Sequence, residues 1–164
     1  MTSYDMLKDK VILAVDDESD VLEVLKEHLD DCLVHTATDR ETALQLLQSY
    51  TYDIVILDIM GVDGFGLLEY CVARGLPTVM LTAQAITPEA LKKAIQLGAV
   101  SFLPKEEISR IASHLQDVVM AEGKPVWRKV FERLEGFFSQ HFGPDWEDKD
   151  RFLKEFMEEL KRTS

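Results

Sequence analysis

The sequence has no long hydrophobic run and only two cysteines. No apolar stretch approaches the roughly 18–20 residues that a membrane-spanning helix needs, so we expect no membrane partner. Cys32 and Cys71 lie in separate apolar segments, without the spacing of a metal site or a disulfide framework. The first ten residues, MTSYDMLKDK, lack the basic and then apolar pattern of a secretion signal. These absences favour a protein of the reducing cytoplasm.

Positive charge is also scarce. The chain carries 18 Lys and Arg against 30 Asp and Glu, a net charge of −12. Residues 1–120 hold 20 acidic and 9 basic residues, whereas residues 121–164 are nearly balanced, with 10 and 9. Nucleic-acid binding needs clustered Lys and Arg. We therefore expect no nucleic-acid partner and no DNA-binding output.

Short apolar runs alternate with helical patterns through the first 120 residues. Fully apolar strands of this kind are typical of a parallel sheet covered by helices on both faces. We predict an α/β fold, a doubly wound (βα)5 flavodoxin-like parallel sheet with strand order 2-1-3-4-5. Candidate helix caps are Asp17 or Ser19, Asp39, and Thr87 followed by a proline. The predicted strands are 10–15, 32–37, 53–57, 77–81 and 100–103, and the predicted helices are 19–31, 39–50, 64–75, 87–99 and 106–120.

The last part of the chain has a different composition. Residues 121–164 contain both tryptophans and six of the eight phenylalanines. Apolar residues at helical spacing predict helices over 125–142 and 145–161, joined at Gly143-Pro144 as a helical hairpin. We predict a first domain over residues 1–121 and a two-helix extension over 122–164. The apolar stripes need a partner, which is the first domain's own surface, a second copy in a homodimer, or a downstream protein.

Acidic residues end two strands that the predicted order makes neighbours. Asp16 and Asp17 follow the first strand, and Asp58 ends the third. Three carboxylates at one edge repel one another, so either a pKa rises or a cation occupies the site. Hard carboxylate oxygens suit Mg²⁺, which also binds phosphate oxygens. The sequence therefore predicts a magnesium site at the switch point of the sheet.

Two further side chains belong to the same edge. Thr82 follows the fourth strand and Lys105 the fifth. A hydroxyl and an ammonium beside a carboxylate–metal cluster can hold a tetrahedral anion, and the chemistry that this indicates is phosphoryl transfer onto an aspartate. Taken singly, Asp17 could only cap a helix and Lys105 could be a solvated charge. Five such residues at the correct strand ends favour the functional interpretation.

Specific motifs resemble a known family over roughly residues 8–120. They are VDDE (15–18), DIVILDIM with DGFGLLE (53–69), VMLTA (79–83) and LKKAIQLGAVSFLPK (91–105). Together they resemble the receiver domain (CheY-like) of bacterial two-component response regulators. The resemblance implies a signalling switch and not an enzyme, phosphorylated by a sensor histidine kinase or phosphotransfer protein. Phosphorylation would change the protein contacts of the face formed by the fourth helix, fifth strand and fifth helix.

The resemblance also implies roles for individual residues. Asp58 would be the phosphoacceptor and part of the Mg²⁺ site. Asp17 would bind Mg²⁺ directly, together with the backbone carbonyl of Met60, and Asp16 would act mainly through metal-bound water. Thr82 would donate a hydrogen bond to the phosphoryl group, Lys105 would form an ion pair with it, and Phe102 would be the aromatic switch residue. Met60 and Gln84 would control the lifetime of the phosphoryl group. Neither of them is a base that could activate water, so we expect slow dephosphorylation.

Two departures from the family pattern concern the loops at this edge. The loop between Asp58 and Asp63, DIMGVD, is shorter than usual and lacks proline, and Glu106 replaces the proline that usually follows the lysine. The short loop leaves open a pseudo-receiver scaffold that takes no phosphate. A Mg²⁺-dependent aspartyl-phosphate phosphatase is disfavoured, because residue 60 is Met instead of a second Asp.

Overall fold

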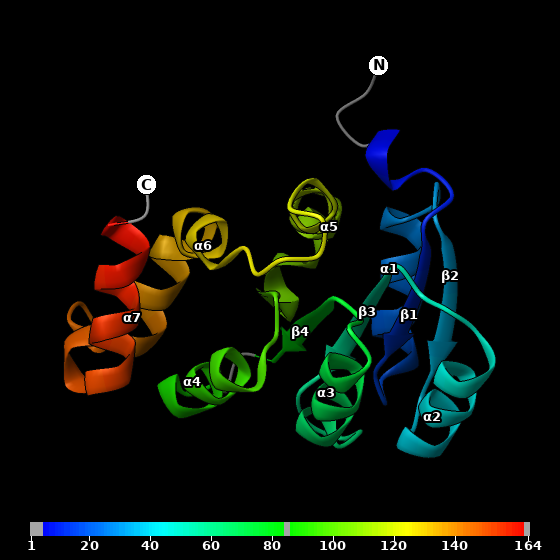
Figure 1. The fold of residues 1–164 in the computed structure, drawn as a ribbon, viewed down its shortest axis with the longest axis horizontal. Helices are drawn as coiled ribbons and strands as arrows, with labels where there is room; N and C mark the ends of the chain where they lie inside the picture. Colours follow the sequence, from blue (N-terminus) through cyan, green and yellow to red (C-terminus); the bar gives the residue numbers. More distant parts are fainter. Residues whose placement is uncertain (1–4, 84–85, 163–164) are drawn as a thin grey trace.

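The strands form one parallel sheet. A computed structural model describes residues 5–83 and 86–162 of the chain. The strand order is β2-β1-β3-β4-β5, with every neighbouring pair parallel (Figure 1). This confirms the predicted order and the doubly wound architecture. The strands are β1 (Val11–Val15), β2 (Leu33–Ala37), β3 (Ile54–Asp58), β4 (Thr78–Thr82) and β5 (Ser101–Pro104).

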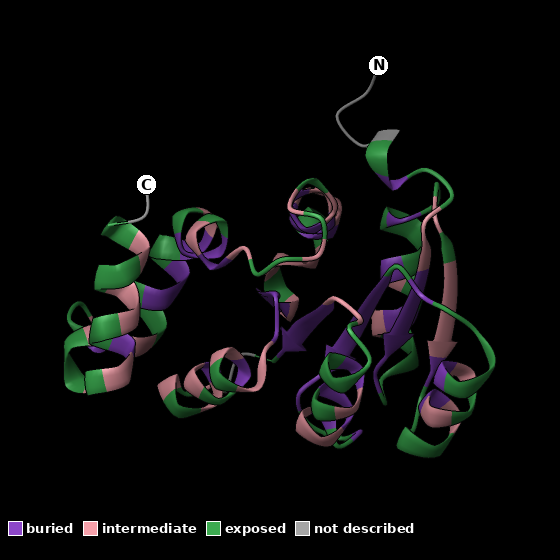
Figure 2. Ribbon diagram, in the orientation of Figure 1, coloured by how far each residue is buried: buried purple, intermediate pink, exposed green. Residues whose placement is uncertain are grey.

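Helices cover both faces of the sheet, so its central strands are buried (Figure 2). Successive residues of one strand point to opposite faces, and each face has its own core. The core on one side joins α2, α3 and α4 to the sheet, and the core on the other side joins α1 and α5 to it. The bounds are α1 (Ser19–His28), α2 (Arg40–Ser49), α3 (Gly64–Ala73), α4 (Pro88–Leu97) and α5 (Ile111–Met120), with short 3₁₀ turns η1 (Asp5–Leu7) and η2 (Lys105–Arg110).

Two of the predicted caps are present. Asp39 Oδ1 accepts a hydrogen bond from the Thr42 amide at 2.7 Å, and Thr87 Oγ1 accepts one from the Ala90 amide at 3.1 Å. Each cap satisfies an amide that has no partner within the first helical turn. The caps fix where α2 and α4 begin, and therefore how these helices leave the sheet.

The predicted cap of α1 is wrong. The residue at the N-cap is Glu18, and its side chain makes no capping hydrogen bond. The Asp16 carboxylate instead accepts the Glu18 amide at 2.9 Å, two residues along the chain. Neither Asp17 nor Ser19 is at the N-cap position, so the carboxylate of Asp17 is not used for a cap.

Several predicted helices are shorter or broken. The helix predicted over 19–31 ends at His28, and the one over 64–75 ends at Ala73. The segment 106–120 is helical only from Ile111, because the preceding 3₁₀ turn η2 buries none of its side chains and has no packed stripe to hold an α-helix.

The predicted last helix is interrupted at Asp150, which has an extended backbone (φ −132°, ψ 124°). Its Oδ1 accepts the Leu153 amide at 3.1 Å and so begins a new helix. The segment is therefore a 3₁₀ turn, η3 (Trp146–Lys149), followed by α7 (Arg151–Arg162).

The C-terminal helices pack against the first domain. α6 (Trp127–Phe142) lies beside β5, and α7 lies against α6 (Figure 1). Aromatic residues of α6 belong to the same apolar core as the sheet face that α3 and α4 cover. The structure thus shows docking within the chain. Self-association, capture of another protein and the domain boundary at 121/122 stay predictions.

Two further features concern the polarity of the helices and the state of the two cysteines. No helix among the described residues is long and apolar enough to cross a membrane. Cys32 and Cys71 are free thiols, and burial raises the pKa of each to about 11. Both thiols are therefore protonated at neutral pH and carry no reactive thiolate.

Candidate functional site

Three predicted site residues meet at the carboxyl edge of the sheet. Asp16 follows β1, Asp58 ends β3 and Lys105 follows β5. Val15 and Leu57 are register partners, so Asp16 and Asp58 stand side by side. Lys105 Nζ lies 2.9 Å from Asp16 Oδ2 and 3.3 Å from Asp58 Oδ1. One ammonium therefore bridges two carboxylates at the topological switch point of the sheet.

The electrostatics of the site follow from burial. Asp16 is fully buried and Asp58 is 3 % exposed, so desolvation disfavours both carboxylates. Burial, together with the nearby Asp16 charge, raises the pKa of Asp58 to about 6, although Lys105 opposes the shift. Burial also raises the pKa of Asp16. Burial lowers the pKa of Lys105, but its hydrogen bonds and charge interactions with the two aspartates outweigh this, so the net shift is upward and the ammonium stays charged.

The donor set fits a hard divalent cation. Carboxylate oxygens of Asp16, Asp17 and Glu18 lie within 4.8 Å of one another. Asp16 Oδ2 is buried, and the Lys105 ammonium lies 2.9 Å from it. A buried oxygen of this kind, beside two exposed carboxylates, suits Mg²⁺ or one of its waters. Asp58 adjoins this group through Lys105.

Glu18 was not among the predicted site residues. Its Oε1 lies 3.5 Å from Lys105 Nζ, and its carboxylate belongs to the acidic cluster. The only sequence signal was its place as the third acid of VDDE. The prediction assigned the first two acids to the metal and gave Glu18 no role.

Glycines allow the short loop after β3 to approach the site. Gly61 has φ +84°, and a Cβ there would lie 2.5 Å from Asp17 Oδ2. A Cβ on Gly64 would lie 2.1 Å from the Asp58 carbonyl oxygen. Both glycines therefore occupy space that no side chain could share. Met60 has an exposed side chain, 72 % accessible, and the contact of its carbonyl with a metal stays a prediction.

The two predicted switch residues lie on β4 and β5. Thr82 is buried and follows Leu81, the register partner of Asp58, and its hydroxyl donates to the Ala83 carbonyl at 3.3 Å. Phe102 is fully buried, and its ring centroid is 5.8 Å from that of Phe138 on α6. Gln84 lies outside the described residues. A change in the position of the Phe102 ring would therefore alter its contact with Phe138 of α6.

The fold and the acidic edge agree with a family match. A model of the response regulator receiver domain matches residues 12–116. The chain belongs to the response regulator receiver domain family. Receiver domains are signalling domains of two-component systems that bind Mg²⁺ at an acidic pocket and are controlled by phosphorylation.

Relatives occur in several kinds of regulator. The two-component response regulator ARR10 of Arabidopsis thaliana is 36 % identical over 115 residues, which are 63 % of this chain and 21 % of that protein. A protein-glutamate methylesterase/protein-glutamine glutaminase of Nitratidesulfovibrio vulgaris is 31 % identical over 128 residues, 69 % of this chain and 35 % of that protein. The crystal structure of a putative response regulator from Chloroflexus aurantiacus is 29 % identical, with a TM-score of 0.61, and covers 70 % of this chain and 99 % of that one. This chain thus spans about a fifth of the length of the first curated relatives it matches.

Proposed function

We propose that the protein is a phosphorylation-dependent switch of a two-component system that accepts a phosphoryl group on Asp58. The donor would be a sensor histidine kinase or a phosphotransfer protein. The observation that carries the proposal is the Lys105 ammonium, which bridges the buried carboxylates of Asp16 and Asp58. A buried carboxylate beside an ammonium and an acidic cluster that could hold a divalent metal has the groups that phosphoryl transfer to an aspartate requires.

Each residue has a definite part in this step. A carboxylate oxygen of Asp58 attacks the phosphorus, and the bond from phosphorus to the donor breaks as the donor atom takes the bonding electron pair. Lys105, already 3.3 Å from Asp58, pairs with a phosphoryl oxygen. The Thr82 hydroxyl turns from the Ala83 carbonyl to donate to another phosphoryl oxygen.

The acidic cluster would hold the metal. Asp16, Asp17, Asp58 and the Met60 carbonyl are the proposed Mg²⁺ ligands, direct or through water, with Glu18 adjacent. When bound, Mg²⁺ neutralises charge on the carboxylates and on the incoming phosphoryl oxygens.

We propose that the protein is cytoplasmic, with a receiver domain over residues 1–121 and an extension over 122–164. Its proposed output is a change in the proteins that it contacts. The extension has nearly balanced charge, which supports contacts with protein and not with nucleic acid. Met60 stands where an aspartyl-phosphate phosphatase needs an acid, so we propose no enzymatic output beyond the domain's own phosphorylation and dephosphorylation.

Intact mass spectrometry with acetyl phosphate and Mg²⁺ tests the proposal. The wild type is expected to gain the mass of one phosphoryl group, and Asp58→Asn to gain none. Asp30→Asn, which removes an exposed acid at the far end of α1, is the matched control and is expected to behave as the wild type. No gain in the wild type would favour the pseudo-receiver scaffold. A gain that persists in Asp58→Asn would exclude Asp58 as the acceptor.

A further inference from the structure

The start of α6 is hydrogen-bonded to the residues directly before β5, the strand that leads to Lys105. The Val126 amide donates to the Val100 carbonyl at 2.8 Å, and Trp127 Nε1 donates to the Ala99 carbonyl at 3.0 Å. β5 is the outermost strand of the sheet, so the chain before α6 satisfies groups at the end of its outer edge. The extension therefore occupies a surface on which another element could otherwise dock.

Ion pairs connect the C-terminal helices to each element around β5. One reaches α5 and is bidentate, one reaches α4, and one reaches η2 directly after Lys105. All three are partly exposed, so each contributes modestly and depends on its surroundings. The pairs are Arg133–Asp117 (2.7 and 3.1 Å), Lys92–Asp150 (3.0 Å) and His141–Glu106 (3.3 Å, an ion pair when the imidazole is protonated).

Aromatic packing completes the contact at the switch residue. Phe138 of α6 is 1 % exposed and lies against Phe102 of β5, with ring centroids 5.8 Å apart. Its other side lies against Trp146, at 5.4 Å. Phe102 is three residues before Lys105, so the short strand that carries the ring in contact with α6 leads directly into the lysine that pairs with Asp58.

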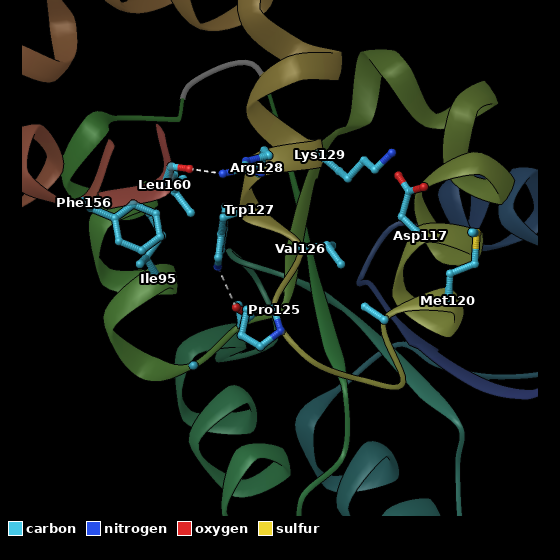
Figure 3. Close-up of a pocket in the computed structure, with 13 residues that line it drawn as sticks. Ile95, Asp117, Met120, Pro125, Val126, Trp127, Arg128, Lys129, Phe156 and Leu160 are labelled. Atoms are coloured by element: carbon cyan, nitrogen blue, oxygen red, sulfur yellow. Dashed lines mark hydrogen bonds between the residues drawn. The ribbon is translucent and has the colours of Figure 1, made fainter. Parts of the chain in front are cut away.

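The seam between the receiver and the extension is incompletely packed. An open groove of about 580 Å³ lies where α4, α5, α6 and α7 meet, and Figure 3 shows its lining, with Ile95, Phe156 and Leu160 together on one side and Asp117 and Met120 of α5 on the other. Side chains that line this groove make fewer dispersion contacts than side chains in a dense core. Docking rests on the buried apolar face of α6, and the Phe102–Phe138 contact and the His141–Glu106 pair join the extension to residues next to the site, where a change at the site can disturb them.

From these contacts we infer that α6 and α7 form a displaceable cap, held on the α4–β5–η2–α5 surface in the unphosphorylated protein and released when Asp58 is phosphorylated. The inference rests on the proposed function. A phosphoryl group draws Lys105 toward itself, and the adjoining Glu106 and the preceding Phe102 are the residues on which His141 and Phe138 dock. Release uncovers the β5 surface and the aromatic side of α6 together.

Tryptophan fluorescence of the full chain tests the release. Both tryptophans, Trp127 and Trp146, belong to the cap and are buried, at 3 % and 5 % exposure. Acetyl phosphate with Mg²⁺ is expected to shift the emission to longer wavelength and to increase quenching by acrylamide, with no change in Asp58→Asn. Intact mass is measured on the same samples. A phosphoryl mass gain with unchanged emission and quenching would overturn the cap alone, whereas no mass gain would overturn both the cap and the proposed function.

Thermodynamic reciprocity gives a second test. If activation releases the cap, weakening the cap must favour activation by the same coupling. Arg133→Gln, which breaks the pair with Asp117, is expected to lower the concentration of beryllofluoride needed for half-saturation, with Mg²⁺ present, by about fivefold. Lys92→Gln, which breaks the pair between α4 and Asp150 of the extension, is also expected to lower the half-saturating concentration.

The control is Arg151→Gln, which removes an exposed pair with Glu155 inside α7 and should leave half-saturation at the wild-type value. Wild-type half-saturation in both Arg133→Gln and Lys92→Gln would contradict the inference, and so would tighter docking on activation.

Discussion

His114 gives a prediction that can be worked through quantitatively. It lies on α5, is 1 % exposed, and its Nε2 has no hydrogen-bond partner in the described part of the chain. Arg133 of α6, Asp117 of α5 and Arg110 of η2 are the charged groups that act on it. Burial, followed by the positive charge of Arg133, lowers the pKa of His114 from 6.5 to about 4. The imidazole is therefore neutral in the folded protein at neutral pH.

The sign of the pH dependence follows from this lowered pKa. Below pH 6.5 the unfolded chain protonates His114 while the folded chain does not, so acid favours unfolding. The contribution to stability is complete above pH 6.5 and is lost as the pH falls toward 4. Between pH 7.5 and pH 5 the loss is about 2 kcal/mol, out of about 3 kcal/mol for the whole shift.

Urea unfolding of the wild type and of His114→Phe, at pH 7.5 and pH 5, measures this contribution. The variant keeps a ring of similar shape and removes the titrating nitrogens. Asp58, with a pKa of about 6, takes up a proton in the folded state over the same range and acts in the opposite direction, but it is common to both proteins and cancels in the comparison. We expect the wild type to lose about 2 kcal/mol more than the variant on acidification. Equal losses would refute the reasoning.

Further outcomes follow from the site loop and the helix ends. Gly61→Ala places a Cβ against the Asp17 carboxylate, whereas the control Gly75→Ala has a similar positive φ but open space around it. In calorimetry, Gly61→Ala should weaken Mg²⁺ binding at least tenfold more than Gly75→Ala. Equal effects would show that backbone strain alone matters. Thr87→Ala should cost about 1 kcal/mol in urea unfolding through loss of the α4 cap, and Thr87→Ser almost nothing, while an unchanged midpoint in Thr87→Ala would show that the cap is not used. Because Met60 offers no base for water, the phosphorylated protein should lose its phosphoryl mass slowly after donor removal, and a half-life of seconds would contradict this.

The sheet and the acidic edge were predictable because local rules determine them. Runs such as VILAV and IVILD, short and rich in β-branched residues, favour buried parallel strands, and parallel strands bring their carboxyl ends to one edge. The site roles of Asp16, Asp58 and Lys105 could be predicted because each residue lies at the carboxyl end of a strand. Their contact through one ammonium is the geometric consequence of the strand order.

The remaining features depend on contacts between segments far apart in the sequence. The apolar stripe of α6 is compatible with docking in the same chain, dimerisation or a partner protein, and the docking in the same chain is seen only from three-dimensional contacts such as that of Phe138 with Phe102. Asp150, where the predicted last helix is interrupted, pairs with Lys92 on α4, 58 residues away. Helical periodicity alone shows neither of these contacts.

The central claim is that Asp58 takes the phosphoryl group. The most direct measurement is borohydride reduction of the phosphorylated protein, followed by mass spectrometry of its peptides to find the reduced residue. The account predicts reduction at Asp58 alone. Reduction at Asp16, at Asp17 or at any other acid, with Asp58 intact, would contradict it.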